Sequence, residues 1–241
     1  MEENGYAILG ILYLEDEMHQ ILSCIENADS NESSSTKTKD LYAIRQLFKI
    51  IPDLATIVFS EKLKEVLFTY FRTNYFLTKA IYFDKPNQSN WFVAYHQDLS
   101  ISVDKKIELE DYRNWTFKKG QYGVQPPLEI LQNTVTVRIH LDKTDKHNGA
   151  LRMIPKSHLH GIIRTDSKDW NLENETICEV EKGGVMLMKP LILHASHKTT
   201  NGERRRVLHL EFNTRELEEP LRWLERYEVN NSYNELGIIE T

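Results

Sequence analysis

The sequence lacks several features that would indicate particular protein classes. Only two cysteines occur, Cys24 and Cys178, so no disulfide framework can form, and reduced thiols are usual in the cytosol. No apolar run approaches the roughly 20 residues of a membrane helix, and the N-terminal stretch lacks the charge order of a signal peptide. We therefore expect a globular protein of the cytoplasm without a membrane partner.

The sequence also has no excess of positive charge. Lys and Arg number 30 against 36 Asp and Glu, and residues 204–206 form the one basic run. Because phosphate binding needs a concentrated excess of Lys and Arg, nucleic acid is not an expected partner. The length of 241 residues suits one well-buried core, so we predict a single domain over residues 1–241.

Near both ends of the chain, apolar residues are spaced as they are on one face of an α-helix. Apolar residues recur at helical spacing over residues 6–28 and 41–70, separated by a polar run at 29–36 that is typical of a loop. This pattern predicts a helical N-terminal region over residues 1–72. A second amphipathic segment, Glu219 to Tyr227, predicts a helix within a C-terminal helix and tail over residues 217–241.

The middle of the chain, residues 73–216, consists of short segments rich in β-branched and aromatic residues. They lie at 76–83, 91–103, 134–142, 150–154, 176–180, 184–188, 191–196 and 205–213. Many short strands without long intervening helices favour a mainly β fold, a sandwich, jelly roll or barrel. Residues 104–132 are too many for a hairpin loop and predict an excursion over one sheet edge.

Three His-x-Asp/Glu pairs could offer an imidazole and a carboxylate on one face of a strand: His96/Asp98, His140/Asp142 and His209/Glu211. Nine histidines and 36 acids give roughly one such pair by chance, so the spacing alone decides nothing. Apolar residues flank His96 and Asp98 on both sides, and a buried carboxylate needs a cation or strong hydrogen bonds. The His140 pair instead runs into a polar turn.

A third metal ligand is needed, since a triad of two histidines and one carboxylate is a common site for catalytic iron. His194 fits best, because it ends an apolar two-strand unit that Gly183 and Gly184 open. Ser196 should point the same way as His194. The other interpretation is a core histidine that bonds to the backbone.

Arg205 lies eleven residues after His194, in the strand 205–213. A guanidinium that points into the barrel could bind a carboxylate in two-point fashion. Arg204 and Arg206 would then share the opposite face. That face also carries Leu208, Leu210 and Phe212, so it could instead be the barrel interior, with Arg206 as the anchor. A solvent-facing basic cluster is the third possibility.

Taken in order, His96-Gln97-Asp98, the stretch NGALRMIPKSH at 148–158, and HAS at 194–196 followed by Arg205 resemble the phytanoyl-CoA dioxygenase family. The resemblance covers roughly Lys79 to Phe212 and includes the order and spacing of four separate elements. It implies a double-stranded β-helix, or jelly roll, that uses Fe(II), O2 and 2-oxoglutarate as cosubstrate.

By this resemblance His96, Asp98 and His194 bind the iron, and Arg205 holds the tail of 2-oxoglutarate with help from Ser196. Arg138 stands where some members carry a tryptophan that lines the cosubstrate pocket. Asp98 favours hydroxylation over halogenation, because related halogenases have a small residue there. The implied function is a dioxygenase that hydroxylates a small-molecule metabolite and releases succinate and CO2.

Two other functions fit less well. A cupin-type metal enzyme without 2-oxoglutarate could use His158 and His160 on a strand, but Arg152 stands where cupins carry a glycine. A jelly-roll binding module would have no redox chemistry. The sequence gives neither the substrate nor the oligomeric state, and it does not require a CoA ester. Gly149, which follows Asn148, is expected to occupy a tight turn and to matter for folding alone.

Overall fold

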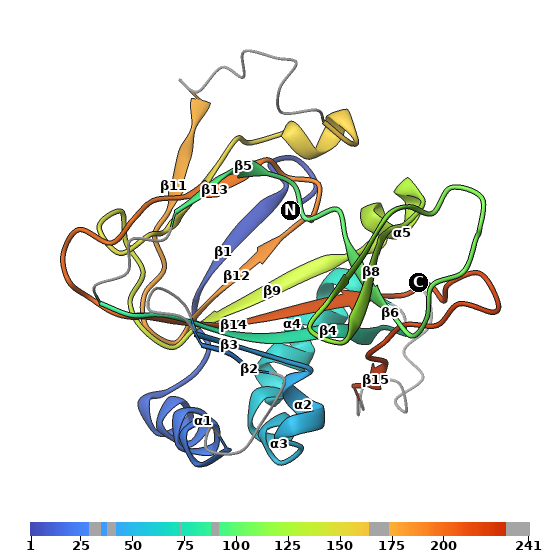
Figure 1. Cartoon of the computed structure of the whole chain (residues 1–241). Coiled ribbons are helices and arrows are strands. Elements are labelled where there is room, and N and C mark those ends of the chain that lie inside the picture. The colour runs from blue at the N-terminus through green and yellow to red at the C-terminus, as the bar shows by residue number, and fades with distance from the viewer. Residues whose placement is uncertain (29–34, 38–41, 73, 88–91, 164–173, 230–241) are drawn as a thin grey trace, which may run out of the picture.

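The computed structural model describes residues 1–28, 35–37, 42–72, 74–87, 92–163 and 174–229 (Figure 1). The helices are α1 (Glu15–Ala28), α2 (Leu47–Ile50), α3 (Leu54–Val58), α4 (Glu61–Phe71), α5 (Leu128–Asn133) and the 3-10 helix η1 (Ser157–His160). The strands are β1 (Tyr6–Ile11), β2 (Ser35–Lys37), β3 (Tyr42–Arg45), β4 (Phe76–Lys85), β5 (Val93–His96), β6 (Ile101–Val103), β7 (Arg113–Lys118), β8 (Gln121–Gln125), β9 (Val135–His140), β10 (Leu151–Met153), β11 (Thr176–Cys178), β12 (Gly184–Met188), β13 (His194–Ser196), β14 (Arg205–Asn213) and β15 (Tyr227–Glu228).

Two antiparallel sheets face each other and form the jelly-roll core that the strand pattern predicts. The large sheet has the order β1-β12-β9-β14-β4-β3-β2, with β15 also paired to β4, and the smaller one has the order β11-β10-β13-β5. Figure 1 shows the β5 and β13 layer on one side of the large sheet and helices α1 to α4 on the other. All eight predicted core segments contain a strand.

Alternation along β14 decides which face of the large sheet meets the helices. Leu208, Leu210 and Phe212 are fully buried in the cluster that the helices make with this sheet. Side chains at odd positions, such as Arg205 and His209, therefore point to the other face, between the two sheets. The interpretation in which the leucine face is the barrel interior is wrong.

Three helix predictions are corrected by the structure. Tyr6–Ile11 forms strand β1, which pairs with β12, and Tyr42–Arg45 forms β3, which pairs with β4. Glu219–Tyr227 forms turns that lead into β15 instead of a helix. Within it Leu221 and Trp223, two positions apart, are both buried, which suits an extended segment and not a helix face.

The excursion predicted at 104–132 contains two strands of a third sheet, whose remaining strand, β6, lies just before it. β7 and β8 pair as neighbours, and β8 also pairs with β6, giving the order β6-β8-β7. Helix α5 follows and leads directly into β9. No helix in the described part of the chain is long and apolar enough to cross a membrane.

Glu225 gives a pH-dependent prediction for this C-terminal segment. Its carboxylate accepts a hydrogen bond from the Ala80 N–H at 3.3 Å, and burial raises its pKa from 4.5 to about 8. The stability that this protonation contributes is complete below pH 4.5 and is lost as the pH rises through about 8. Glu225→Gln should therefore raise the melting temperature, relative to wild type, more at pH 8 than at pH 5. An equal difference at both pH values would contradict the assignment.

Candidate metal and cosubstrate site

Two histidines from distant parts of the chain meet across a pair of short strands. β5 ends at His96 and β13 begins at His194, and the antiparallel register sets these residues opposite each other. Their ring centroids are 4.2 Å apart. The pairing of β5 with β13 therefore fixes the distance between two possible metal ligands.

Asp98 completes a three-ligand group. Its N–H donates a 2.9 Å hydrogen bond to the Pro190 carbonyl, which ties it to the segment that leads into β13. One carboxylate oxygen lies 3.6 Å from Nε2 of His96 and the other 3.7 Å from Nε2 of His194. The three ligand atoms lie within 4.8 Å of one another, which fits a shared ion at bond lengths of about 2.0–2.2 Å.

Backbone carbonyls orient both rings. Nδ1–H of His96 donates to the Ala94 carbonyl and Nδ1–H of His194 to the Ile192 carbonyl, each at 2.9 Å. Both Nε2 atoms are then left as metal-binding lone pairs. Burial lowers the pKa of His194 to about 4, so its ring is neutral at pH 7, which is the form that binds a metal. This donor set fits iron(II).

The three ligands open onto a cavity of about 300 Å³. All three side chains that the sequence places near the cosubstrate, Arg205, Ser196 and Arg138, line this same cavity. Arg205 is partly exposed as a residue, but desolvation of its guanidinium lowers its pKa to about 9, so it stays charged at pH 7. It donates to the carbonyl of Gly149.

The neighbouring arginines point away and have carboxylate partners. Arg204 donates to Asp84, and Arg206 donates to both oxygens of Asp142 at 2.7 and 2.9 Å. Arg205, on the opposite face, has a neutral carbonyl partner and faces the metal ligands. Of the three consecutive arginines, it is the one placed to meet an acidic ligand in the cavity.

A family model described as phytanoyl-CoA dioxygenase (PhyH) matches residues 1–207. The chain belongs to the phytanoyl-CoA dioxygenase family. It is therefore an iron(II)- and 2-oxoglutarate-dependent oxygenase. No curated protein matches the sequence.

Solved structures share the fold of this phytanoyl-CoA dioxygenase family member at low identity. EctD from S. alaskensis, with 2-oxoglutarate and 5-hydroxyectoine, has a TM-score of 0.68 at 17% identity over 90% of this chain and 76% of that one. AviO1 from Streptomyces viridochromogenes Tue57 has a TM-score of 0.62 at 17% identity, over 88% of this chain and 90% of that one. HygX from Streptomyces hygroscopicus, with nickel, 2-oxoglutarate and hygromycin B, has a TM-score of 0.62 at 14% identity, over 90% of this chain and 88% of that one.

The other histidine pairs in this family member are engaged elsewhere. His140 shares a 2.8 Å hydrogen bond with the Thr144 hydroxyl, and Asp142 is held by Arg206. The pair His158 and His160 lies on the 3-10 helix η1 and not on a strand, so the cupin-type expectation is wrong on this point. Within the described residues, His96, Asp98 and His194 are the one cluster suited to a metal.

Lys85 is a site residue that the sequence analysis missed. It ends β4 opposite Arg205 on β14, and its Nζ donates a 2.6 Å hydrogen bond to the His197 carbonyl. Burial, with Arg205 nearby, lowers its pKa to about 8. The only sequence signal was its place at the end of an apolar strand, and the pairing partner of that strand was unknown.

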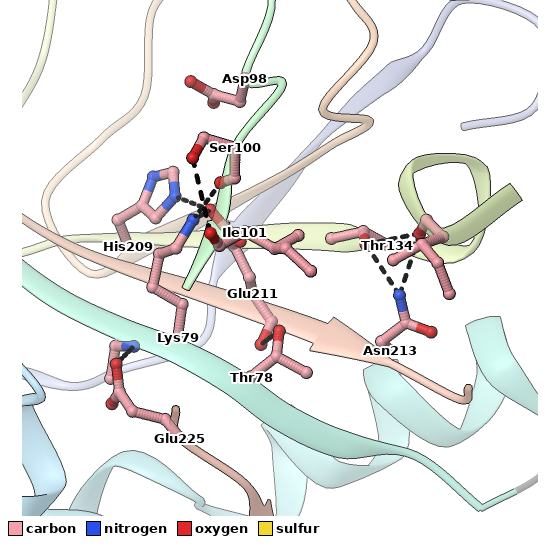
Figure 2. A network of polar contacts seen from close by, with 12 residues as sticks. Thr78, Lys79, Asp98, Ser100, Ile101, Thr134, His209, Glu211, Asn213 and Glu225 are labelled. Atoms are coloured by element: carbon pink, nitrogen blue, oxygen red, sulfur yellow. Dashed lines mark hydrogen bonds and ion pairs between the residues drawn. The ribbon is translucent and has the colours of Figure 1, made fainter. Parts of the chain in front are cut away.

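His209 and Glu211 form an inner polar chain instead of a second metal pair. His209 donates from Nε2 to Glu211 at 3.1 Å, and Lys79 donates to the same carboxylate at 2.8 Å. Figure 2 shows these side chains meeting beside Ser100, whose carbonyl accepts a second bond from Lys79 at 2.9 Å. The other ring nitrogen of His209 accepts from Arg138 at 3.0 Å.

Gly149 serves both folding and the cavity. Its φ is +89°, and a Cβ there would lie 2.8 Å from Nζ of Lys85 and 3.7 Å from a guanidinium nitrogen of Arg205. Gly149→Ala should therefore cost about 1–2 kcal/mol of stability and also weaken 2-oxoglutarate binding, since the Lys85 ammonium must move whereas Arg205 is in ordinary contact. From the sequence we expected Gly149 to matter for folding alone, and its contact with Lys85 adds an expected effect on cosubstrate binding. Melting curves and cosubstrate titrations measure the two effects.

Gly202→Ala is the matched control for that prediction. Gly202 has a φ of +71°, but a Cβ there would meet nothing within 4 Å. We expect a similar loss of stability with unchanged cosubstrate affinity. Equal cosubstrate affinity in both variants would show that Gly149 has no role beyond the turn.

Proposed function

We propose that His96, Asp98 and His194 hold iron(II), that Arg205 and Lys85 bind the distal carboxylate of 2-oxoglutarate, and that the enzyme hydroxylates a small molecule. The observation that carries the proposal is the shared cavity. A metal-ligand triad and two desolvated cations open onto the same space of about 300 Å³. A dicarboxylate that reaches from the metal to Arg205 would satisfy both.

Each protein group has a definite part in this proposal. The backbone bonds of His96 and His194 hold their Nε2 atoms toward one point, so the triad needs little rearrangement on loading. The guanidinium of Arg205 and the ammonium of Lys85 fix the acid tail of the cosubstrate, with the Ser196 hydroxyl as a further donor. Iron, when bound, supplies the oxygen chemistry by which 2-oxoglutarate becomes succinate and CO2.

The cavity size and two solved structures of similar fold support a small substrate. A volume of about 300 Å³ lies at the lower end of the roughly 300–1,000 Å³ of small-molecule sites. HygX and EctD were crystallised with hygromycin B and 5-hydroxyectoine, which are small molecules. We also propose a cytoplasmic location, which the two free cysteines suit.

The direct test is iron-dependent conversion of 2-oxoglutarate. Purified protein with ferrous iron, oxygen and 2-oxoglutarate should release succinate, and omission of iron should stop the release. Iron-dependent oxygen uptake without succinate would indicate a cupin-like enzyme that does not use 2-oxoglutarate. No oxygen uptake in the presence of iron and metabolite extracts would indicate a binding module.

A further inference from the structure

The cavity carries more positive charge than its lining neutralises. Four cations line it: Lys85 and Arg138 are buried, the guanidinium of Arg205 is desolvated, and Arg45 is partly buried, whereas Asp98 is the one carboxylate among the described lining residues. The acceptors of Lys85, Arg138 and Arg205 are neutral: the His197 carbonyl, the His209 imidazole and the Gly149 carbonyl. Buried charges require counter-charges to offset their desolvation, so ligands must supply them.

The loaded site does not remove this excess. Divalent iron and the doubly negative cosubstrate cancel in net charge, so four cations still face one carboxylate. The distal carboxylate of 2-oxoglutarate is assigned to Arg205 and Lys85, which flank Gly149 together. Its other carboxylate belongs to the metal. Arg138 then remains without an anion.

Among the described residues, Arg138 is the cavity cation that has a buried nitrogen without a hydrogen-bond partner. It lies on β9 at 7% exposure, and within the described part of the chain its guanidinium makes one hydrogen bond, to His209. Its Nε is buried and has no partner among those residues. Burial lowers its pKa to about 10, so it remains charged at pH 7.

The chain of Lys79, Glu211 and His209 positions this guanidinium and preserves its charge. Because Glu211 accepts Nε2–H of His209, the lone pair lies on Nδ1 and accepts from Arg138. A carboxylate at position 209 would have paired with the arginine. The neutral imidazole satisfies one N–H and leaves the positive charge for a ligand.

We propose that Arg138 binds an acidic group of the primary substrate, so that the enzyme oxidises small molecules that carry a carboxylate. This inference rests on the proposed 2-oxoglutarate chemistry of the same cavity. A carboxylate that meets the guanidinium makes charge-assisted, two-point hydrogen bonds, which orient the rest of the molecule toward the metal. The acid group therefore determines specificity.

The experiment uses simple acids as probes. Anaerobic protein loaded with iron(II) and 2-oxoglutarate is titrated with benzoate, cyclohexanecarboxylate and N-acetylglycine, each compared with its primary amide. The visible charge-transfer absorption of the iron–cosubstrate complex reports binding, and succinate release after admission of oxygen reports coupling. We expect saturable binding of at least one acid, accelerated succinate release, and neither effect with its amide.

Arg138→Gln should weaken acid binding at least about tenfold while the Kd for 2-oxoglutarate changes less than about threefold. Arg138→Lys should retain weakened acid binding, and it supplies the test if the glutamine variant does not fold. Arg204→Gln, outside the cavity, is the matched control and should bind acids as wild type does. The melting temperature of unloaded Arg138→Gln should stay near that of wild type, because the substitution removes both the cost of burying the charge and its attraction to Asp98.

Three results would overturn the proposal: acids and amides that bind alike, no saturable binding of any acid at millimolar concentrations, or loss of 2-oxoglutarate affinity in Arg138→Gln with acid binding intact. The last would assign Arg138 to the metal-side carboxylate of the cosubstrate. Failure of the proposed function looks different, since wild-type protein would then show no charge-transfer absorption with 2-oxoglutarate and no succinate.

Discussion

Asp98→Ala will abolish iron-dependent succinate release while the chain remains folded. The remaining two imidazoles cannot hold a catalytic first-row metal in the three-ligand geometry that leaves positions open for cosubstrate and oxygen. His96→Ala and His194→Ala should have the same effect, because the three ligand atoms lie within 4.8 Å of one another and act as one site. Iron content after desalting, succinate release and thermal melts separate metal loss from unfolding.

His140→Ala is the control, since it removes a histidine with the same sequence spacing to an acid. His140 is bonded to Thr144, and we expect near-native iron content with a stability loss of about 1–3 kcal/mol from the broken buried hydrogen bond. If His140 proved necessary for iron binding and His96 dispensable, the assignment of the triad would be wrong.

Arg205→Ala will weaken 2-oxoglutarate binding by at least about tenfold. Loss of a desolvated charge-assisted pair costs about 2–5 kcal/mol, and about 1.4 kcal/mol corresponds to tenfold in affinity. Lys85 lies beside the same carboxylate position and should prevent complete loss. Anaerobic titration of 2-oxoglutarate into the iron(II)-loaded variant gives the dissociation constant directly.

Arg204→Ala separates cosubstrate binding from general damage to β14. Its removal leaves Asp84, which is 3% exposed, without its arginine, so the melting temperature should fall. The affinity for 2-oxoglutarate should stay near the wild-type value. Near-native affinity in Arg205→Ala, or a large loss in Arg204→Ala, would refute the choice of anchor.

The core strands could be predicted because they are made by local patterns. Each of the eight segments is a short β-branched and aromatic run bounded by turn residues, and each contains a strand of the jelly roll. β1 and β3 were missed because short apolar runs fit either a helix or a strand. Their pairing partners, β12 and β4, decide the outcome, and these lie far away along the chain.

The site residues also fall into those that the sequence could predict and those that depend on distant pairing. His96, Asp98 and His194 could be predicted because the residue types, their spacing and the family resemblance agree. Lys85 and Gly149 could not, because their roles depend on the register between β4 and β14 and on a turn packed beneath it. The predicted C-terminal helix failed because Leu221 and Trp223 pack at a spacing of two residues, and Pro220 disfavours a helical residue before it.

The pairing of His96 with His194 also makes iron a cross-link. These residues are 98 positions apart, and the strands that carry them pair over a short register, so a bound ion joins two segments that the unfolded chain keeps apart. A ligand that binds only the native state stabilises it by about 2.7 kcal/mol at one hundred times its Kd. Iron supply should therefore set protein lifetime in the cell, with the metal-free chain opening more often and being degraded first.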